Sequence, residues 1–221
     1  RSTRYGCRQR QMCIRDRDIA GLVKGAAVGE GLGNSFLSNI REMTALAHVV
    51  RCFEDDNIAH VNGSVDPKGD VEIINLELIL ADLESVSKRI LRAEKLLKTN
   101  DKENKIRYEL IHSIKNELEL GKLINLEDYE LSNQKIIKEF QLLTSKPTFF
   151  VANVDESEDS KLHLERLKKF ATDIGASVIP ASIKIEQEIS LLKDEEKSEY
   201  LELLGMSEPC LLYTSDAADE P

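Results

Sequence analysis

The sequence predicts an α/β fold: a parallel β-sheet with flanking helices, into which an antiparallel coiled-coil helical hairpin is inserted. Two observations lead to this prediction. Short apolar segments of β type alternate with segments of helical period, which is typical of a parallel sheet. Between two of the β-type segments, apolar residues recur at alternating spacings of three and four over about three heptads, as they do in a coiled coil.

The two ends of the chain differ in composition from the rest. Residues 1–17 contain six Arg and no Lys, whereas residues 18–209 contain six Arg and eighteen Lys. Residues 210–221 continue no period of the preceding segment. Both ends resemble translated adapter sequence, so we expect residues 1–17 and 210–221 to be non-native tails outside the fold.

Residues 18–74 are expected to form the first part of the sheet domain. A glycine-rich stretch follows Asp18, a segment of helical period comes next, and a β-type run extends from His48 to Phe53. A glycine-rich loop, a helix and a strand in this order favour a β-α-β unit.

Residues 75–122 are expected to form the inserted hairpin. The apolar seam of the first helix is Leu76, Ile79, Leu83, Val86, Ile90, Ala93 and Leu97. The polar segment 99–101 interrupts it, and a second helix follows with apolar residues at a spacing of four: Ile106, Leu110, Ile114 and Leu118. Gly121 is expected to end that helix. Because the turn between them is short, the two helices should pack antiparallel.

Residues 123–209 are expected to complete the sheet domain. A helix near 132–143 precedes the apolar run 148–152, which suits a central parallel strand because it is apolar on both faces. The sequence then predicts a helix over 161–174, a strand over 177–180 and one further helix over 185–204.

Composition disfavours several functional classes. The formal net charge of −10 disfavours a general nucleic-acid-coating role through phosphate neutralisation and leaves a local basic patch as the alternative. No apolar run approaches the roughly 20 residues of a membrane helix. Within 18–209 the only cysteine is Cys52, which excludes a disulfide framework and is expected to pack in the core. These features predict a cytoplasmic protein without membrane or DNA partners.

Asp18 and Gly21 follow the pattern of a nucleotide-hydrolase switch. There, an Asp at a strand end reaches Mg²⁺, and a nearby Gly lets its backbone N–H approach the terminal phosphate. The position after the glycine is Leu22, which cannot orient a water as Gln does in many GTPases. The alternative is an ordinary strand-to-loop turn, since Asp-x-x-Gly is common.

The segment Asn153-Val154-Asp155-Glu156 stands where such enzymes recognise the base. Guanine-specific enzymes have Asn-Lys-x-Asp there, and the longer side chain of Glu156 would misplace the paired contact to guanine. Asn153 can pair with adenine through both ends of its amide, so adenine is expected to be preferred. The alternative is a polar loop after a buried strand. Ser182 and Ile183 follow the next predicted strand, where a third loop would offer backbone N–H groups to the base.

These segments together closely resemble the YchF-type subfamily of the Obg-like P-loop NTPases. The resemblance covers residues 18–209 and rests on the following segments: Asp18-Ile-Ala-Gly-Leu-Val-Lys-Gly-Ala, Gly29-Glu-Gly-Leu-Gly-Asn, His48-Val-Val-Arg-Cys-Phe-Glu, Leu78-Ile-Leu-Ala-Asp-Leu-Glu, Ala152-Asn-Val-Asp-Glu and Ile185-Glu.

The resemblance implies a partial P-loop NTPase domain that binds and hydrolyses ATP in preference to GTP, uses Mg²⁺ and associates with ribosomes, with the large subunit as the expected contact. It implies that Asp18 is the catalytic acid on the Mg²⁺ side, that Gly21 contacts phosphate, that Asn153 and Glu156 recognise the base, and that Val154 lies against adenine.

The 221 residues contain no Gly-x-x-x-x-Gly-Lys-Ser/Thr phosphate loop, so the chain by itself is expected to be truncated and inactive. Two alternatives stay open: a GTP-binding switch associated with translation, and a non-catalytic interaction module built on the coiled-coil hairpin.

Overall fold

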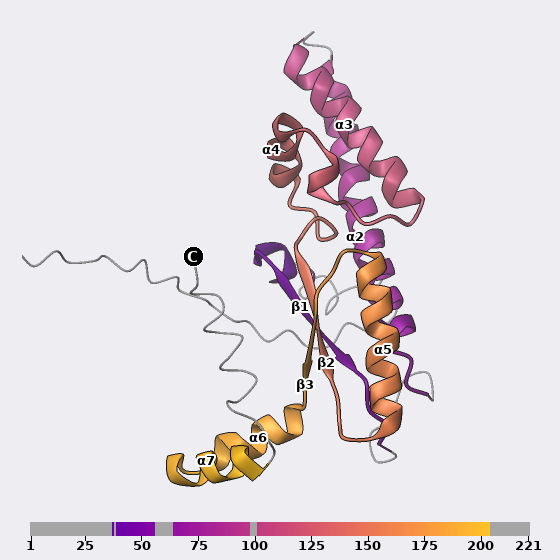
Figure 1. Ribbon diagram of the computed structural model, residues 1–221. Coiled ribbons are helices and arrows are strands. Elements are labelled where there is room, and N and C mark those ends of the chain that lie inside the picture. Colours follow the sequence, from indigo (N-terminus) through magenta and orange to yellow (C-terminus); the bar gives the residue numbers. More distant parts are fainter. Residues whose placement is uncertain (1–36, 38, 56–63, 98–100, 204–221) are drawn as a thin grey trace, which may run out of the picture.

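The computed structural model describes residues 37, 39–55, 64–97 and 101–203 (Figure 1). Its elements are, in order, β1 (Leu46–Arg51), α2 (Pro67–Leu96), α3 (Lys102–Glu119), the 3₁₀ helix η2 (Leu126–Asp128), α4 (Leu131–Phe140), β2 (Thr148–Asn153), α5 (Glu158–Asp173), β3 (Val178–Ala181), α6 (Ile183–Leu191) and α7 (Asp194–Leu203). The predicted α/β fold with a parallel sheet is confirmed. The predictions for both tails, for Asp18 and for Gly21 lie outside the described residues.

The described strands form one parallel sheet in the order β1-β2-β3. β2 is the central strand, as its apolar sequence predicts. The register aligns the last residues of the strands, because Asn153 is the partner of both Arg51 and Ala181. All three strands therefore end at the same edge of the sheet, and Figure 1 shows α6 and α7 beyond that edge, at the end of the molecule opposite to the hairpin.

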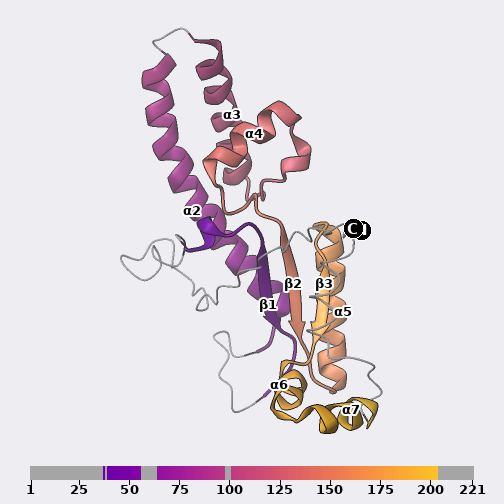
Figure 2. The same cartoon turned by 90° about the vertical axis from the view of Figure 1, so that its left-hand side faces the viewer.

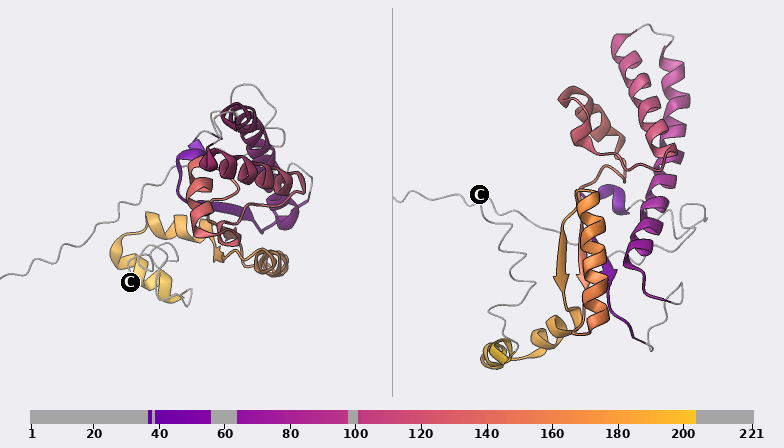
Figure 3. Two further views of the ribbon diagram at one scale, coloured as in Figure 1. Left: turned by 90° about the horizontal axis from the view of Figure 1, so that it is seen from above. Right: turned by 45° about the vertical axis from the view of Figure 1, so that its right-hand side comes forward.

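One face of the sheet is covered by α5 and the first turns of α2. Their side chains enclose a core with the inward-facing residues of β1 and β2, and Figure 3 shows α5 lying along the strands. The buried members of this core are Val50, Cys52, Val71, Phe150, Ala152, Leu167 and Ala171. The predicted core position of Cys52 is confirmed, since the residue is 0% exposed.

Helices α2 and α3 form an antiparallel hairpin that projects from the sheet (Figure 2). α2 has 30 residues, which is a length of about 45 Å. The core between α2, α3 and α4 contains the predicted seam residues Ile79, Val86, Ile90 and Ala93. Gly121, with φ +74°, follows the end of α3, as predicted.

Two predicted seam positions are wrong. Leu76 is 52% exposed, because α3 has 18 residues and can flank only about the last 18 residues of α2. Ile106 is 49% exposed. A strict spacing of four advances about 40° around a helix at each step, so the first member of that row lies away from the seam.

The single helix predicted over 185–204 is also wrong, since the structure has two helices there. Leu192 is extended, with φ −77° and ψ 153°, and ends α6. A new helix starts because the Glu196 carboxylate accepts a hydrogen bond from the Lys193 N–H at 3.3 Å, in the manner of a capping box.

A buried carboxylate joins the hairpin to the sheet. Asp82 of α2 is 0% exposed and accepts hydrogen bonds from the backbone N–H groups of Leu143 and Thr144 at 3.0 and 2.9 Å, and from the Thr144 hydroxyl at 2.9 Å. The Arg41 guanidinium lies 3.5 Å from the same carboxylate. Burial raises the pKa of Asp82, and these donors offset that effect only in part. We call this group the Asp82 junction.

Candidate functional site

The edge where the three strands end carries the loops predicted to bind a base. The main chain continues the sheet for one residue beyond the strands, because Cys52 N–H donates to the Asn153 carbonyl at 2.9 Å and Val154 N–H donates to the Ala181 carbonyl at 3.1 Å. The loops after β2 and β3 therefore begin side by side.

The side chain of Asn153 connects these two loops. Its Oδ1 atom accepts a hydrogen bond from the backbone N–H of Ile183 at 3.3 Å. The structure thus brings together Asn153, Ser182 and Ile183, which sequence reasoning placed in separate loops. Oδ1 keeps a second lone pair, and the two Nδ2 donors point to no partner among the described residues, so the amide can still form a paired contact.

The loop after β2 is fixed by two serines. Ser157 is the N-cap of α5 and accepts from Ser160 N–H at 3.2 Å, while Asp155 N–H donates to the Ser160 hydroxyl at 3.0 Å. The Asp155 carboxylate accepts from Ser157 N–H at 3.0 Å and from its hydroxyl. Partial burial raises the pKa of Asp155, but the hydrogen bonds from Ser157 outweigh it and hold that pKa below its usual value.

The two acids of this loop therefore differ. Asp155 is engaged by Ser157, whereas the Glu156 side chain is exposed. Val154 is half-buried and packs against the core under the sheet. A contact between Val154 and adenine, which the family resemblance implies, would have to use the part of the side chain that this packing leaves accessible.

Helices α6 and α7 add groups that sequence reasoning did not identify. The Tyr200 hydroxyl donates to the Glu188 carboxylate at 2.8 Å. The pKa of Tyr200 is raised by this hydrogen bond, which is the largest cause, then by partial burial, and then by the charges of Glu188 and Glu156. Nothing in the sequence signals this contact. Ser157 and Ser160, by contrast, follow the sequence pattern of a helix N-terminus, so their capping role could have been predicted from it.

The segment after β1 curls around Arg51. Its guanidinium donates to the carbonyls of Phe53 and Asp55 at 2.9 and 3.2 Å and lies 4.9 Å from the centre of the Phe53 ring. The next residue, Cys52, is buried in the core, and burial followed by the charge of Asp70 raises the pKa of its thiol to about 11. A thiol with so high a pKa is a poor nucleophile at neutral pH.

No group of three or more His, Cys, Asp or Glu side chains in the described ranges could hold a metal ion. Asp18, the predicted metal ligand, and Gly21 lie outside those ranges. None of the helices within them is long and apolar enough to cross a membrane.

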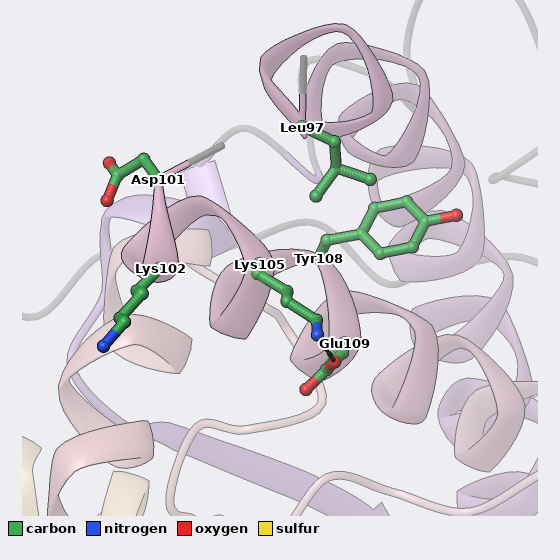
Figure 4. Close-up of a pocket in the computed structure, with 6 residues that line it drawn as sticks. All are labelled: Leu97, Asp101, Lys102, Lys105, Tyr108 and Glu109. Carbon is green, nitrogen blue, oxygen red and sulfur yellow. Dashed lines mark ion pairs between the residues drawn. The ribbon is translucent and has the colours of Figure 1, made fainter. Parts of the chain in front are cut away.

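A separate hollow of about 300 Å³ lies at the free end of the hairpin (Figure 4). Its lining residues are Leu97, Asp101, Lys102, Lys105, Tyr108 and Glu109. Lys105 and Glu109 pair at 4.0 Å across one turn of α3. Because this hollow is at the end of the molecule opposite to Asn153, it does not belong to the base site.

Known proteins resemble the chain over most of its length. The Ribosome-binding ATPase YchF of Bacillus subtilis is 48% identical over 195 residues, which cover 86% of this chain and 53% of that protein. The Escherichia coli O157:H7 protein of the same name is 43% identical over 195 residues, covering 88% of the chain and 54% of that protein. The chain thus spans about half the length of these curated relatives.

A solved structure agrees with the sequence comparisons. The YchF GTPase of Schizosaccharomyces pombe matches with a TM-score of 0.73 and 33% identity, over 90% of this chain and 56% of that one. No protein-family model matches. The sequence and fold likenesses together show that the chain belongs to the YchF family of P-loop NTPases.

Proposed function

We propose that the chain carries the base-recognition part of an ATP-preferring, Mg²⁺-dependent nucleoside-triphosphate hydrolase that associates with ribosomes in the cytoplasm. Asn153 and Glu156 recognise adenine, Val154 lies against its ring, and backbone N–H groups near Ser182 and Ile183 complete the base site. GTP binds more weakly.

The observation that carries this proposal is the different use of the two acids beside Asn153. A guanine site needs a carboxylate at the fourth position of the loop that accepts from two donors of the base. Both acids of this loop are exposed, but the shorter one, Asp155, accepts hydrogen bonds from Ser157, and the acid at the fourth position is the longer Glu156. Asn153, anchored through Oδ1 to Ile183, retains donors and a lone pair that match the edge of adenine.

The catalytic roles rest on the sequence pattern. Asp18 would hold Mg²⁺ and Gly21 would approach the terminal phosphate, as in the switch of related hydrolases. When bound, Mg²⁺ neutralises charge on the phosphate oxygens. Leu22 cannot position the attacking water, so another group has that task.

Ribosome association is supported by the names of the bacterial relatives, and we place the contact on the large subunit. GTP is the second candidate nucleotide, because the Schizosaccharomyces pombe relative is described as a GTPase. The exposed Glu156 in place of Asp favours ATP over this alternative.

The test is a titration of the isotope-labelled chain with ATP and with GTP, followed by NMR, which detects weak binding. We expect ATP to shift the amide signals of 153–157 and 182–184 more strongly than GTP does. The double variant Val154→Lys with Glu156→Asp should move the ratio of the two affinities toward GTP by about tenfold, since a paired base contact contributes roughly 1–3 kcal/mol.

Glu158→Asp is the matched control, because it shortens an exposed acid in the first turn of α5 without touching the base loops. If the double variant and the control gave the same ATP/GTP ratio, the base-recognition role would be wrong.

A further inference from the structure

Three arginines line a pocket between the hairpin and α4. It has a volume of about 160 Å³, and Arg89 and Arg92 reach it from α2 while Arg107 reaches it from α3. The remaining lining residues are Ala93, Leu96, Asn104, Ile111 and Phe140. The pocket lies on the hairpin, at the opposite end of the molecule from the base site. We call it the arginine pocket.

The three guanidinium groups are unequally neutralised. Arg107 pairs with Glu139 at 2.7 Å and with Glu103 at 3.1 Å. Arg89 donates only to the Phe140 carbonyl, at 3.0 Å, and its buried Nε has no hydrogen-bond partner. Arg92 is exposed, and no carboxylate in the described part of the chain pairs with it.

This excess of positive charge affects the pKa of Arg89. Burial lowers the pKa of its guanidinium, and the charges of Arg41 and Arg92 lower it further. A half-buried cation beside like charges is costly unless an anion accompanies it. In a chain with a net charge of −10, carboxylates are abundant, yet none in the described ranges forms an ion pair with Arg89 or Arg92, and the charge of Asp82 offsets the effect on Arg89 only in part.

The geometry selects the kind of anion. A planar carboxylate satisfies one guanidinium edge, as Glu103 does by accepting from Nε and Nη2 of Arg107. Arg107 is already paired with Glu103 and Glu139, so the guanidinium groups that can hold a further anion are those of Arg89 and Arg92, three residues apart on α2. Two neighbouring guanidinium groups suit the several oxygens and the higher charge of a phosphate group. Ala93 and Ile111, which also line the pocket, are buried and apolar, and apolar surroundings strengthen contacts between charges.

We propose that the arginine pocket binds a backbone phosphate of ribosomal RNA. This inference rests on the proposed ribosome association and deepens it, because it identifies RNA as the contacted chemistry and the hairpin flank as the contacting surface. Arg92 makes the principal contact, and Arg89 supports it from the pocket wall.

The test measures binding of the 221-residue chain to purified ribosomes and, separately, to protein-free ribosomal RNA, over a series of salt concentrations. Arg92→Glu places a carboxylate beside Arg89 and should weaken both interactions about tenfold at low salt, while reducing the slope of log affinity against log salt by about one. Arg92→Lys keeps the charge but loses the fork, so the slope should stay and the affinity should fall a few-fold.

Lys168→Glu on α5 makes the same change in net charge away from the hairpin, at an exposed residue paired only with Glu165, and should leave binding unchanged. Equal losses for Arg92→Glu and Lys168→Glu would overturn the pocket. So would weaker ribosome binding with an unchanged salt slope, which would indicate an acidic protein as the partner. A chain that binds free RNA through Arg92 but not ribosomes would overturn the ribosome association and leave the pocket standing.

Discussion

The two ends of this molecule are stabilised in different ways. At the sheet edge, main-chain hydrogen bonds and the Asn153 and Ser157 side chains fix the loops, so polar groups determine their positions. At the hairpin, an apolar seam holds α2 and α3 together, and the charged side chains stay on its flanks. The difference indicates that the sheet edge is built to place individual atoms, whereas the hairpin is built to present a surface.

The Asp82 junction is the structural link between these ends. It lies on α2, whose first turns pack against the sheet and whose last turns belong to the hairpin. Arg41 and the segment from Gln141 to Thr144 meet there, since Arg41 also donates to the Gln141 carbonyl at 3.1 Å. Perturbing the junction, the seam and the sheet edge in turn therefore tests whether the two ends are independent.

The largest expected effect is that of Asp82→Ala. The substitution leaves the N–H groups of Leu143 and Thr144 and the charge of Arg41 without their acceptor, and breaking a buried ionic group of this kind costs about 3–5 kcal/mol. Urea unfolding would measure it. Glu84→Ala, two residues further along α2, removes only an exposed pair with Lys88 and should cost less than about 0.5 kcal/mol. Similar losses for both variants would contradict the role of the junction.

Truncation of the seam comes next. Ile114 is 0% exposed, so Ile114→Ala should cost about 2–5 kcal/mol in free energy of unfolding. Leu83 is only half-buried, and Leu83→Ala should cost less than Ile114→Ala does. Neither change should alter the ratio of ATP to GTP affinity measured by NMR, because the seam lies far from Asn153. A shift in that ratio would show that the two ends are coupled.

Regular elements were predictable from the sequence because their periods are local. The strand that ends at Asn153 follows from its apolar run. The start and the end of α3 follow from the polar interruption at 99–101 and from Gly121. The proximity of Asn153 and Ile183 was also predictable, since parallel strands end at one edge. The domain limits at residues 75 and 122, and the roles of the site residues, stay predictions.

The Asp82 junction and the arginine pocket were not predictable. Asp82 is in contact with residues about 60 positions away in the sequence, and a single Asp in a charged helix looks like a solvated residue until its partners are known. Arg89, Arg92 and Arg107 belong to two helices and gather only through the register of the hairpin. No local pattern determines either arrangement.

A third prediction uses pH to perturb the sheet end alone. Burial raises the pKa of the Cys52 thiol from 9.0 to about 11. Because the native state favours the neutral thiol, its contribution to stability is complete below pH 9 and is lost as the pH rises through about 11. Between pH 7.5 and 10.5, wild type should therefore lose about 2 kcal/mol more than Cys52→Ala does. Equal losses in urea unfolding would mean that the native thiol ionises freely.

The smallest expected effect is that of Ser157→Ala. Ser157 caps α5 and donates to Asp155, so its loss should cost about 1 kcal/mol in unfolding free energy. The backbone N–H of residue 157 still donates to Asp155, but without the hydroxyl the carboxylate is held by one hydrogen bond fewer, so a shorter acid beside Glu156 can compete for the base. We therefore expect a weaker preference for ATP over GTP together with this modest loss of stability. Ser190→Ala is the matched control, since that hydroxyl donates only to the Gln187 carbonyl within α6. If both variants kept the ATP/GTP ratio of wild type, Asp155 would have no influence on base choice. The positions of individual atoms at the sheet edge would then not determine which nucleotide binds.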